Sequence, residues 1–235
     1  MIRARAAAWV ALAGALCLLA WAALAYVPPA ERIARAVAET NRALGRARTL
    51  ELRVSLERED GEELAFGSLL TDPNGGARLE VKHASGFVER QLRRGKALEA
   101  SRDGSRIESP HPLLAPLSVL QAEHGAVLQS RIAELGGRPD AVALGHEGDH
   151  DCFVLGGKDA PASYWVDQES LEPVRIDLPG GVRYRLGAPR MHDGIQLPST
   201  ITIEAPGRSA LRMSVSEARP STAPPDAFDA AWLTR

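Results

Sequence analysis

The sequence predicts an α+β fold made mainly of one strongly curled antiparallel sheet of about ten or eleven strands. Short segments that alternate apolar and polar residues recur roughly every ten residues, with turn residues between them. One amphipathic helix precedes the series, and one apolar insertion, 111–135, interrupts it. Because strands twist with a fixed hand, a sheet of this many strands curls, and the insertion is the natural cover for its concave face.

The clearest strands lie between Ser163 and Leu186. In 174–178 and again in 182–186, every second residue is apolar and the residues between them are charged. A period of two places each apolar set on one face of a sheet and each charged set on the other. The apolar face must be buried, and aliphatic residues of this kind suit either a packed core or an apolar cavity.

Further strands follow from residue 50 onward. In 50–56 the apolar residues are even-numbered and the polar ones odd-numbered, and in the next strand Leu64, Phe66 and Leu70 form the apolar set. Asp-Gly and Pro-Asn-Gly-Gly turns separate the early strands. The expected strands are 50–56, 64–70, 78–82, 87–92, 97–100, 106–108, 142–144, 152–155, the three segments of 163–186, 195–204 and 211–217.

Two helical regions are expected. The N-terminal helix runs from Pro28 to about Arg46 and carries a thin apolar stripe at helical spacing. The insertion 111–135 is rich in leucine, and its two prolines are placed for helix starts. This predicts two short helices divided near Gly125.

The first 25 residues are expected to be an export signal. Two arginines precede an uncharged run, and Ala23 and Ala25 supply the small residues of a signal peptidase site, which predicts cleavage before Tyr26. The alternative is an uncleaved anchor, because about 20 apolar residues span a bilayer. In either case we expect the rest of the chain, 26–235, to form a single domain outside the cytoplasm.

Charge and cysteine content narrow the class of protein. Loss of the two signal arginines leaves 26 basic against 30 acidic residues, a charge that does not indicate nucleic-acid binding. Cys17 lacks the sequence context of an acylated lipoprotein cysteine, since Leu16 precedes it. Cys152 is then the only cysteine of the exported domain, so no internal disulfide forms there. We expect Cys152 to be a small buried side chain in a strand.

The basic residues between 90 and 106 fall on adjacent expected hairpins. They are Arg90, Arg93, Arg94, Lys96, Arg102 and Arg106. They form either a cationic patch for anionic lipid headgroups or the polar outer face of a strand pair.

Residues 146–150, HEGDH, match the H-E-x-x-H pattern of zinc metalloproteases. That chemistry requires a helix, which places both histidines on one face beside a zinc-bound water. The glycines at 145 and 148 and the strand-like CFVL that follows predict a hairpin turn instead, with a zinc or adventitious metal site as the alternative. The sequence contains no G-x-S-x-G and no glycine-rich phosphate loop after a strand, so we expect neither catalysis nor a cofactor.

Several short motifs occur along the same chain. They are YWVD followed by PVR (164–175), DGIQLP (193–198), GSLLTDPN (67–74), RGKAL (94–98) and Phe228 near the end. Together with the order of signal, helix, strands, insertion and further strands, they resemble the LolA-like superfamily. That superfamily includes LolA-type lipoprotein carriers, LppX-like proteins and RseB-type proteins.

The resemblance implies an incomplete, half-closed β-barrel that holds acyl chains of a lipid or lipoprotein under a helical lid. It implies a non-enzymatic carrier in the periplasm, anchored to the inner membrane if the signal is kept, with a transporter or another envelope protein as candidate partners. The alternative is an RseB-like envelope sensor or scaffold that acts through protein contacts. Burial of acyl chains in an aliphatic groove contributes about 0.8 kcal/mol per CH₂. The expected lipid-binding residues are Leu52, Val54, Phe66, Leu113, Leu117, Leu120, Leu128, Val174, Ile176, Val182, Tyr184 and Ile201.

The chain departs from the superfamily pattern in two respects. The carriers' tryptophans and other aromatic residues near the early strands are missing, since Leu70 and Leu79 stand where rings often do. LolA-type carriers have a basic residue immediately before the early proline, tied to control of the lid, whereas Asp72 precedes Pro73 here. The resemblance therefore favours the fold and lipid binding over lipoprotein shuttling.

Overall fold

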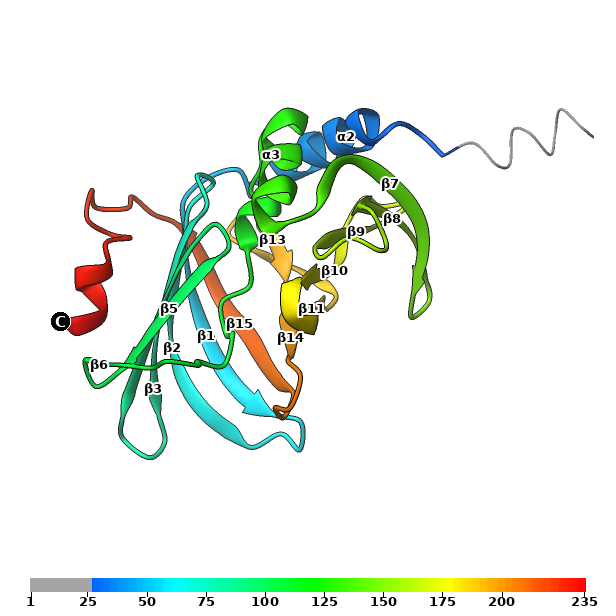
Figure 1. Ribbon diagram of the computed structural model, residues 1–235. Coiled ribbons are helices and arrows are strands. Elements are labelled where there is room, and N and C mark those ends of the chain that lie inside the picture. Colours follow the sequence, from blue (N-terminus) through cyan, green and yellow to red (C-terminus); the bar gives the residue numbers. More distant parts are fainter. Residues whose placement is uncertain (1–26) are drawn as a thin grey trace, which may run out of the picture.

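A computed structural model describes residues 27–235, and the expected export signal with Cys17 lies outside them. Within this part of the chain, thirteen strands form one antiparallel sheet in the order β6-β5-β4-β3-β2-β1-β15-β14-β11-β10-β9-β8-β7. The sheet curls without closing, since β6 and β7 lie at its two ends (Figure 1). The expected antiparallel half-barrel is thus confirmed. In the same residues, no helix is long and apolar enough to cross a bilayer.

The bounds of the elements agree with most of the expected segments. The strands are β1 (Leu50–Arg58), β2 (Glu63–Thr71), β3 (Gly76–His83), β4 (Val88–Arg94), β5 (Ala97–Arg102), β6 (Ser105–Arg106), β7 (Arg138–Glu147), β8 (His150–Gly156), β9 (Ser163–Asp167), β10 (Pro173–Leu178), β11 (Val182–Leu186), β12 (Pro189–His192), β13 (Ile195–Pro198), β14 (Thr200–Glu204) and β15 (Leu211–Pro220). The helices are α2 (Ala30–Ala43) and α3 (Gly125–Leu135), with 3₁₀ turns η1 (Leu117–Val119), η2 (Pro179–Gly181) and η3 (Ala230–Thr234). β12 pairs with β13 in a small separate sheet.

The expected single strand 195–204 is divided into β13 and β14. β13 pairs with β12 in the small sheet, whereas β14 pairs with β11 and β15 in the large one. The division falls after Pro198, which has no N–H to continue a ladder. The chain leaves one sheet and enters the other at this point.

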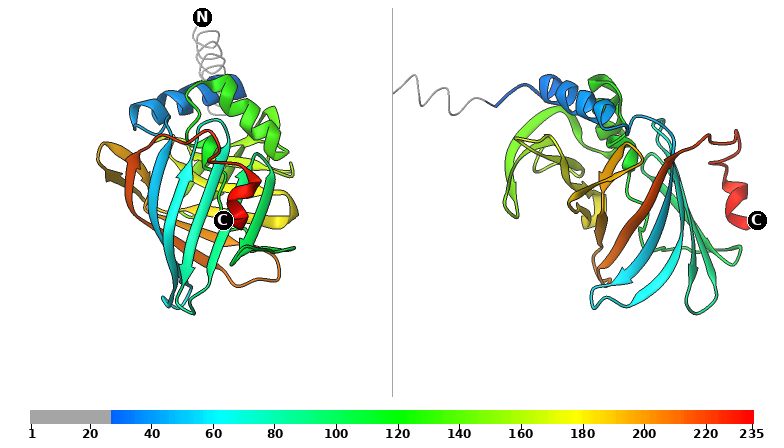
Figure 2. Two further views of the ribbon diagram at one scale, coloured as in Figure 1. Left: turned by 90° about the vertical axis from the view of Figure 1, so that its left-hand side faces the viewer. Right: turned by 180° about the vertical axis from the view of Figure 1, so that it is seen from behind.

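The strand order determines where the insertion runs. From β1 the chain adds strands outward to β6 at one end of the sheet, and it resumes with β7 at the opposite end. The segment 107–137 joins these two ends and therefore crosses the open side of the half-barrel (Figure 1, Figure 2). β15 then returns to the middle of the sheet, beside β1. The cover of the concave face is thus a consequence of strand order.

One hydrophobic core lies between the concave face, the insertion and α2. Along β1 the even-numbered side chains from Leu50 to Leu56 expose 3% of their surface or less, as their alternation predicts. Ile33 and Val37 of α2 belong to the same buried cluster. Because the sheet alone leaves its concave face open, the insertion and α2 complete the core.

The two helices lie side by side at one end of the half-barrel (Figure 1). Gly125 permits their approach, since a Cβ atom there would lie 2.8 Å from the backbone nitrogen of Arg35. α3 ends at Gly136, which adopts the left-handed conformation typical of a helix C-terminus.

The prediction of two helices in the insertion is wrong for the first of them. Residues 111–124 contain only the short turn η1 and are otherwise irregular. Pro112 and Pro116 lack an N–H group and restrict the residues before them to extended conformations. Only the second half of the insertion, α3, is an α-helix.

The apolar set expected for β2 faces the wrong way. Ala65 and Leu69 lie in the core, whereas Phe66 points outward. The register pairs Leu69 with Leu52 of β1, and directly opposed residues share a face. A shift of one residue exchanges the two faces of a strand, so the pairing with β1 overrides the local pattern of β2.

In β4, too, the side chains that face the core are not the apolar ones. Its buried inward-facing side chains are polar: Glu89, Gln91 and Arg93. Leu92 instead packs against Trp232 and Leu233 of the C-terminal turn η3, which lies on the outer face of the sheet (Figure 2). The C-terminal segment thereby buries an apolar side chain that the concave core does not accommodate.

Replacement of Gly125 by valine is expected to lower the free energy of unfolding by about 1–3 kcal/mol, because its side chain collides with the backbone of α2. Urea unfolding followed by circular dichroism measures the change. Ala126→Val is the matched control, since Ala126 is exposed and the substitution there is expected to change stability by no more than about 0.5 kcal/mol. Equal stability of the two variants contradicts the close helix contact.

Candidate functional site

The candidate site is the concave face together with residues 111–122, which we call the cover segment. Most of the expected lipid-binding residues meet here. Buried in the main core are Leu52, Val54, Leu113, Leu117, Leu120, Leu128, Ile176, Tyr184 and Ile201, with Val182 partly buried against it. The structure thus brings these side chains together, and their contact with lipid stays a prediction.

Two of the expected residues lie elsewhere. Phe66 points away from the concave face and exposes 58% of its surface. Val174 belongs to a separate small cluster with Cys152, Val154 and Trp165. The bulge between Pro173 and Arg175 in the pairing of β10 with β9 removes Val174 from the alternation that the sequence predicts.

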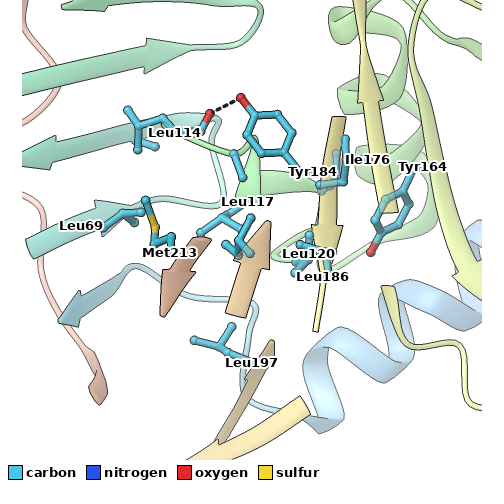
Figure 3. Close-up of a cluster of buried hydrophobic side chains, with 14 of the residues drawn as sticks. Leu69, Leu114, Leu117, Leu120, Tyr164, Ile176, Tyr184, Leu186, Leu197 and Met213 are labelled. Carbon is cyan, nitrogen blue, oxygen red and sulfur yellow. Dashed lines mark hydrogen bonds between the residues drawn. The ribbon is translucent and has the colours of Figure 1, made fainter. Parts of the chain in front are cut away.

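The concave face is filled by side chains of the cover segment. Leu113, Leu114, Leu117 and Leu120 each expose 4% of their surface or less. Figure 3 shows Leu117 in the middle of the buried cluster, among side chains of several strands. Since neither partner of this contact retains solvent-exposed surface, the two halves pack as a continuous core.

Gln91 of β4 forms hydrogen bonds with the first residues of the cover segment. Its amide nitrogen donates to the carbonyl oxygen of His111 at 2.6 Å, and its amide oxygen accepts from the backbone N–H of Leu113 at 3.0 Å. The Leu113 N–H and the His111 carbonyl oxygen also bond to each other at 2.8 Å, but an irregular segment lacks the ladder of a helix or strand, so a side chain adds the partners it needs in an aliphatic core. Gln91 does so for both a donor and an acceptor.

Arg93 and Tyr184 reach the same part of the cover segment from opposite walls of the half-barrel. Arg93 donates from Nε to the carbonyl oxygen of Leu114 at 2.8 Å and from Nη2 to the Tyr184 hydroxyl at 3.3 Å. The Tyr184 hydroxyl lies 2.9 Å from the carbonyl oxygen of Pro112 and 3.1 Å from that of Leu114, which Figure 3 marks. Burial raises the pKa of Tyr184, so its hydroxyl remains a neutral donor.

The other end of the cover segment is fastened by a second polar group. Asn41 of α2 donates to the carbonyl oxygen of Ala122 at 3.2 Å. Gln121 donates to the carbonyl oxygen of Arg48 and accepts from the Thr71 hydroxyl, both at 2.7 Å. Leu117 and Leu120 therefore lie between two groups of polar contacts, one at residues 111–114 and one at residues 121–122.

Among the described residues, Asp72 makes no hydrogen bond or ion pair with the cover segment. It accepts from the Thr49 hydroxyl at 2.8 Å and from the backbone N–H of Asn74 at 2.6 Å, which stabilises the turn after β2. The guanidinium that does hold the cover segment comes from Arg93. Sequence reasoning placed Arg93 in a surface patch, and only the inversion of β4 turns it inward.

The other basic residues of that group lie mainly in ion pairs on the surface of the sheet. Arg90 pairs with Glu80 at 2.6 Å, Arg94 with Glu99 at 2.6 Å and Arg102 with Glu89 at 3.6 Å. Charges paired in this way leave little net positive potential for an anionic surface.

The HEGDH motif forms the β7–β8 hairpin, as the glycines predict. Glu147 opposes His150 and His146 opposes Asp151, so the two histidines point to opposite faces of the hairpin. Glu147 accepts from Arg175 at 2.8 Å, and His150 contacts Asp167 at 3.0 Å. In the described residues, no group of three or more His, Cys, Asp or Glu side chains has a geometry that could hold a metal ion.

A second concavity lies on the outer face of the sheet. It is an open groove of about 1200 Å³ between β1, β2, β3, β15 and the turn that joins β12 to β13. Phe66 and Met191 line it and expose 58% and 56% of their surface. Charged side chains surround them, among which Arg53 pairs with Glu217 at 3.1 Å.

No protein-family model and no curated protein matches the chain. Solved structures do match. A LolA superfamily protein from Nitrosomonas europaea superposes with a TM-score of 0.56 at 16% identity, covering 88% of this chain and 100% of that one. A putative outer membrane lipoprotein-sorting protein domain from Vibrio parahaemolyticus gives 0.46 at 12% identity, covering 85% and 97%, and a DUF1329 family protein from Desulfovibrio piger gives 0.41 at 14%, covering 88% and 100%.

The likeness to the Nitrosomonas protein shows that this chain has the fold of the LolA superfamily. The resemblance that the sequence motifs predicted is confirmed at the level of fold. At 16% identity, the site must be argued from the residues of this chain.

Cys152 is expected to be unreactive in the native protein. Burial, with Asp167 adding to it, raises the pKa of its thiol to about 11, so at pH 8 the thiolate is about one molecule in a thousand, against about a quarter for an ordinary cysteine. In a Cys17→Ser background, a chromogenic disulfide reagent should label native protein at least about 100-fold more slowly than protein in urea. Rapid labelling of the native protein contradicts this environment.

Proposed function

We propose that the chain is a non-enzymatic lipid-binding protein of the cell envelope, in which acyl chains replace the cover segment on the concave face. One observation carries the proposal. The leucines that fill the concave face belong to a segment outside the sheet, and this segment is held by hydrogen bonds at its two ends. Such a segment can leave without disrupting the strand pairing.

The closed state, in which leucines fill the concave face, and the lipid-bound state, in which an acyl chain fills it, bury apolar groups of comparable free energy. Burial of four leucine side chains contributes about 6–12 kcal/mol, and burial of a twelve-carbon chain contributes about 9 kcal/mol. An acyl chain therefore compensates for the loss of the leucine contacts, and the protein remains closed when no lipid is present. Replacement of the cover segment by an acyl chain is common to lipid binding and to lipoprotein carrying. The headgroup and the partner protein decide which cargo is bound.

Leu117→Ala is expected to increase the apparent affinity for a fatty acid. The substitution costs the closed state about 2–5 kcal/mol, so the binding-competent open state becomes more populated, and the affinity should rise at least about tenfold. Titration with the fluorescent fatty acid parinaric acid measures the affinity, and mass spectrometry of the purified protein identifies copurified lipid.

Leu92→Ala is the control for this experiment. Leu92 is equally buried but lies on the outer face, in the cluster with Trp232. Its truncation should lower stability without changing fatty-acid affinity. Absence of copurified lipid, combined with no uptake of parinaric acid by either the wild type or Leu117→Ala, contradicts the proposed function.

A second candidate is an envelope sensor or scaffold that acts through protein contacts. The filled concave face and the outer groove with its two exposed apolar side chains favour it. Under this function, Phe66→Asp should abolish capture of an envelope protein by cross-linking in cells, while leaving parinaric acid binding unchanged. Leu144→Asp, which alters an exposed leucine outside the groove, is the control. Capture that survives Phe66→Asp contradicts this candidate.

A further inference from the structure

Arg93 is a buried cation that has no carboxylate partner. Its side chain is 97% buried, yet within residues 27–235 no carboxylate oxygen lies within 4 Å of it. Its hydrogen bonds go to the Leu114 carbonyl and the Tyr184 hydroxyl. By contrast, the other buried arginine of residues 27–235, Arg46, pairs with Glu172.

An unpaired guanidinium in an aliphatic core is costly, because neutral carbonyl and hydroxyl groups replace only part of its hydration. The cover segment supplies these neutral groups. Three donors from the walls of the half-barrel, on Gln91, Arg93 and Tyr184, converge on carbonyl oxygens of residues 111–114. Three convergent donors that include a guanidinium form an arrangement suited to the oxygens of an anion.

We infer that Arg93, Tyr184 and Gln91 form a recognition site for the anionic headgroup of an amphiphile, either a carboxylate or a phosphate. The inference rests on the proposed function, since the site becomes free only when the cover segment leaves. The carbonyl oxygens of residues 111–114 then occupy the positions that the headgroup oxygens take in the bound state. The acyl chain replaces the leucines that follow them.

Nearby charges are compatible with an anion at this place. Glu89 lies on the same face of β4, but its carboxylate is 3.6 Å from the Arg102 guanidinium and accepts from the Gln91 amide at 2.7 Å. Arg93 also retains Nη1, which donates no hydrogen bond in the described part of the chain. An anion with several oxygens can use this donor, whereas the cover segment does not.

The test compares ligands that share a chain and differ in charge. Binding of radiolabelled laurate and of uncharged dodecanol to the protein produced from the full sequence is measured by equilibrium dialysis, below the concentrations at which either aggregates. Both ligands must displace the cover segment, so the ratio of their affinities reports the headgroup contact alone. We expect laurate to bind at least about tenfold more tightly than dodecanol.

Arg93→Met should reduce that ratio to within about threefold of one, whereas the control Arg94→Met, which alters an exposed arginine paired with Glu99, should leave it unchanged. If Arg93 only fastens the cover segment, Arg93→Met strengthens both ligands equally and the ratio stays high, which overturns the inference. A ratio near one in the wild type overturns it while leaving lipid binding intact. Failure of both ligands to bind either the wild type or Leu117→Ala overturns the proposed function itself.

Tyr184→Phe provides a second variant if Arg93→Met does not fold, because it removes one donor and conserves the ring. It should lower the ratio at least about threefold, and an unchanged ratio contradicts the site. Dodecyl phosphate in place of laurate shows which headgroup is preferred, since the tighter of the two identifies it. Inorganic phosphate alone should not displace laurate at millimolar concentration, because it has no chain to replace the leucines of the cover segment, and displacement overturns the inference.

Discussion

The structure depends on one constraint: an irregular stretch of backbone lies inside an aliphatic core, and its polar groups must find partners there. Buried N–H and C=O groups that lack a hydrogen bond are costly, and the cover segment satisfies only part of its own through short-range bonds such as that from the Leu120 N–H to the Leu117 carbonyl oxygen. The side chains of Gln91, Arg93 and Tyr184 supply the missing partners at one end of the cover segment, and Asn41 and Gln121 do so at the other. Where these polar residues lie on the half-barrel follows from this need.

The inversion of β4 and the position of the C-terminus follow from the same constraint. Because Gln91 and Arg93 face the core, the alternating residue Leu92 must face outward, where a bare sheet surface would expose it. Trp232 and Leu233 cover it, and the guanidiniums of Arg78 and Arg90 lie 5.2 and 5.8 Å from the Trp232 ring. The final turn of the chain is thus coupled, through a single strand, to the fastening of the cover segment on the other face.

The core of this protein is completed by a segment that takes no part in the strand pairing. The strands of the half-barrel are held by ladders that do not involve residues 111–122. Loss of the cover segment therefore exposes apolar surface without unfolding the sheet, and any ligand that covers the same surface stabilises the open state by mass action. The closed structure holds its own segment where an acyl chain is proposed to bind.

The sequence by itself determined the fold class, since the alternation along 50–56 and 174–178, the turns between strands and the position of the insertion all follow from local patterns. It also predicted that HEGDH lies in a hairpin turn, because the glycines at 145 and 148 disfavour a helix there, and the pairing of β7 with β8 confirms it. Only the tertiary structure decided which face of β2 and of β4 is buried, because strand register is a contact between distant segments and a shift of one residue reverses it. For that reason Phe66 lies outside the site and Arg93 lies within it, although the sequence indicated the opposite for both.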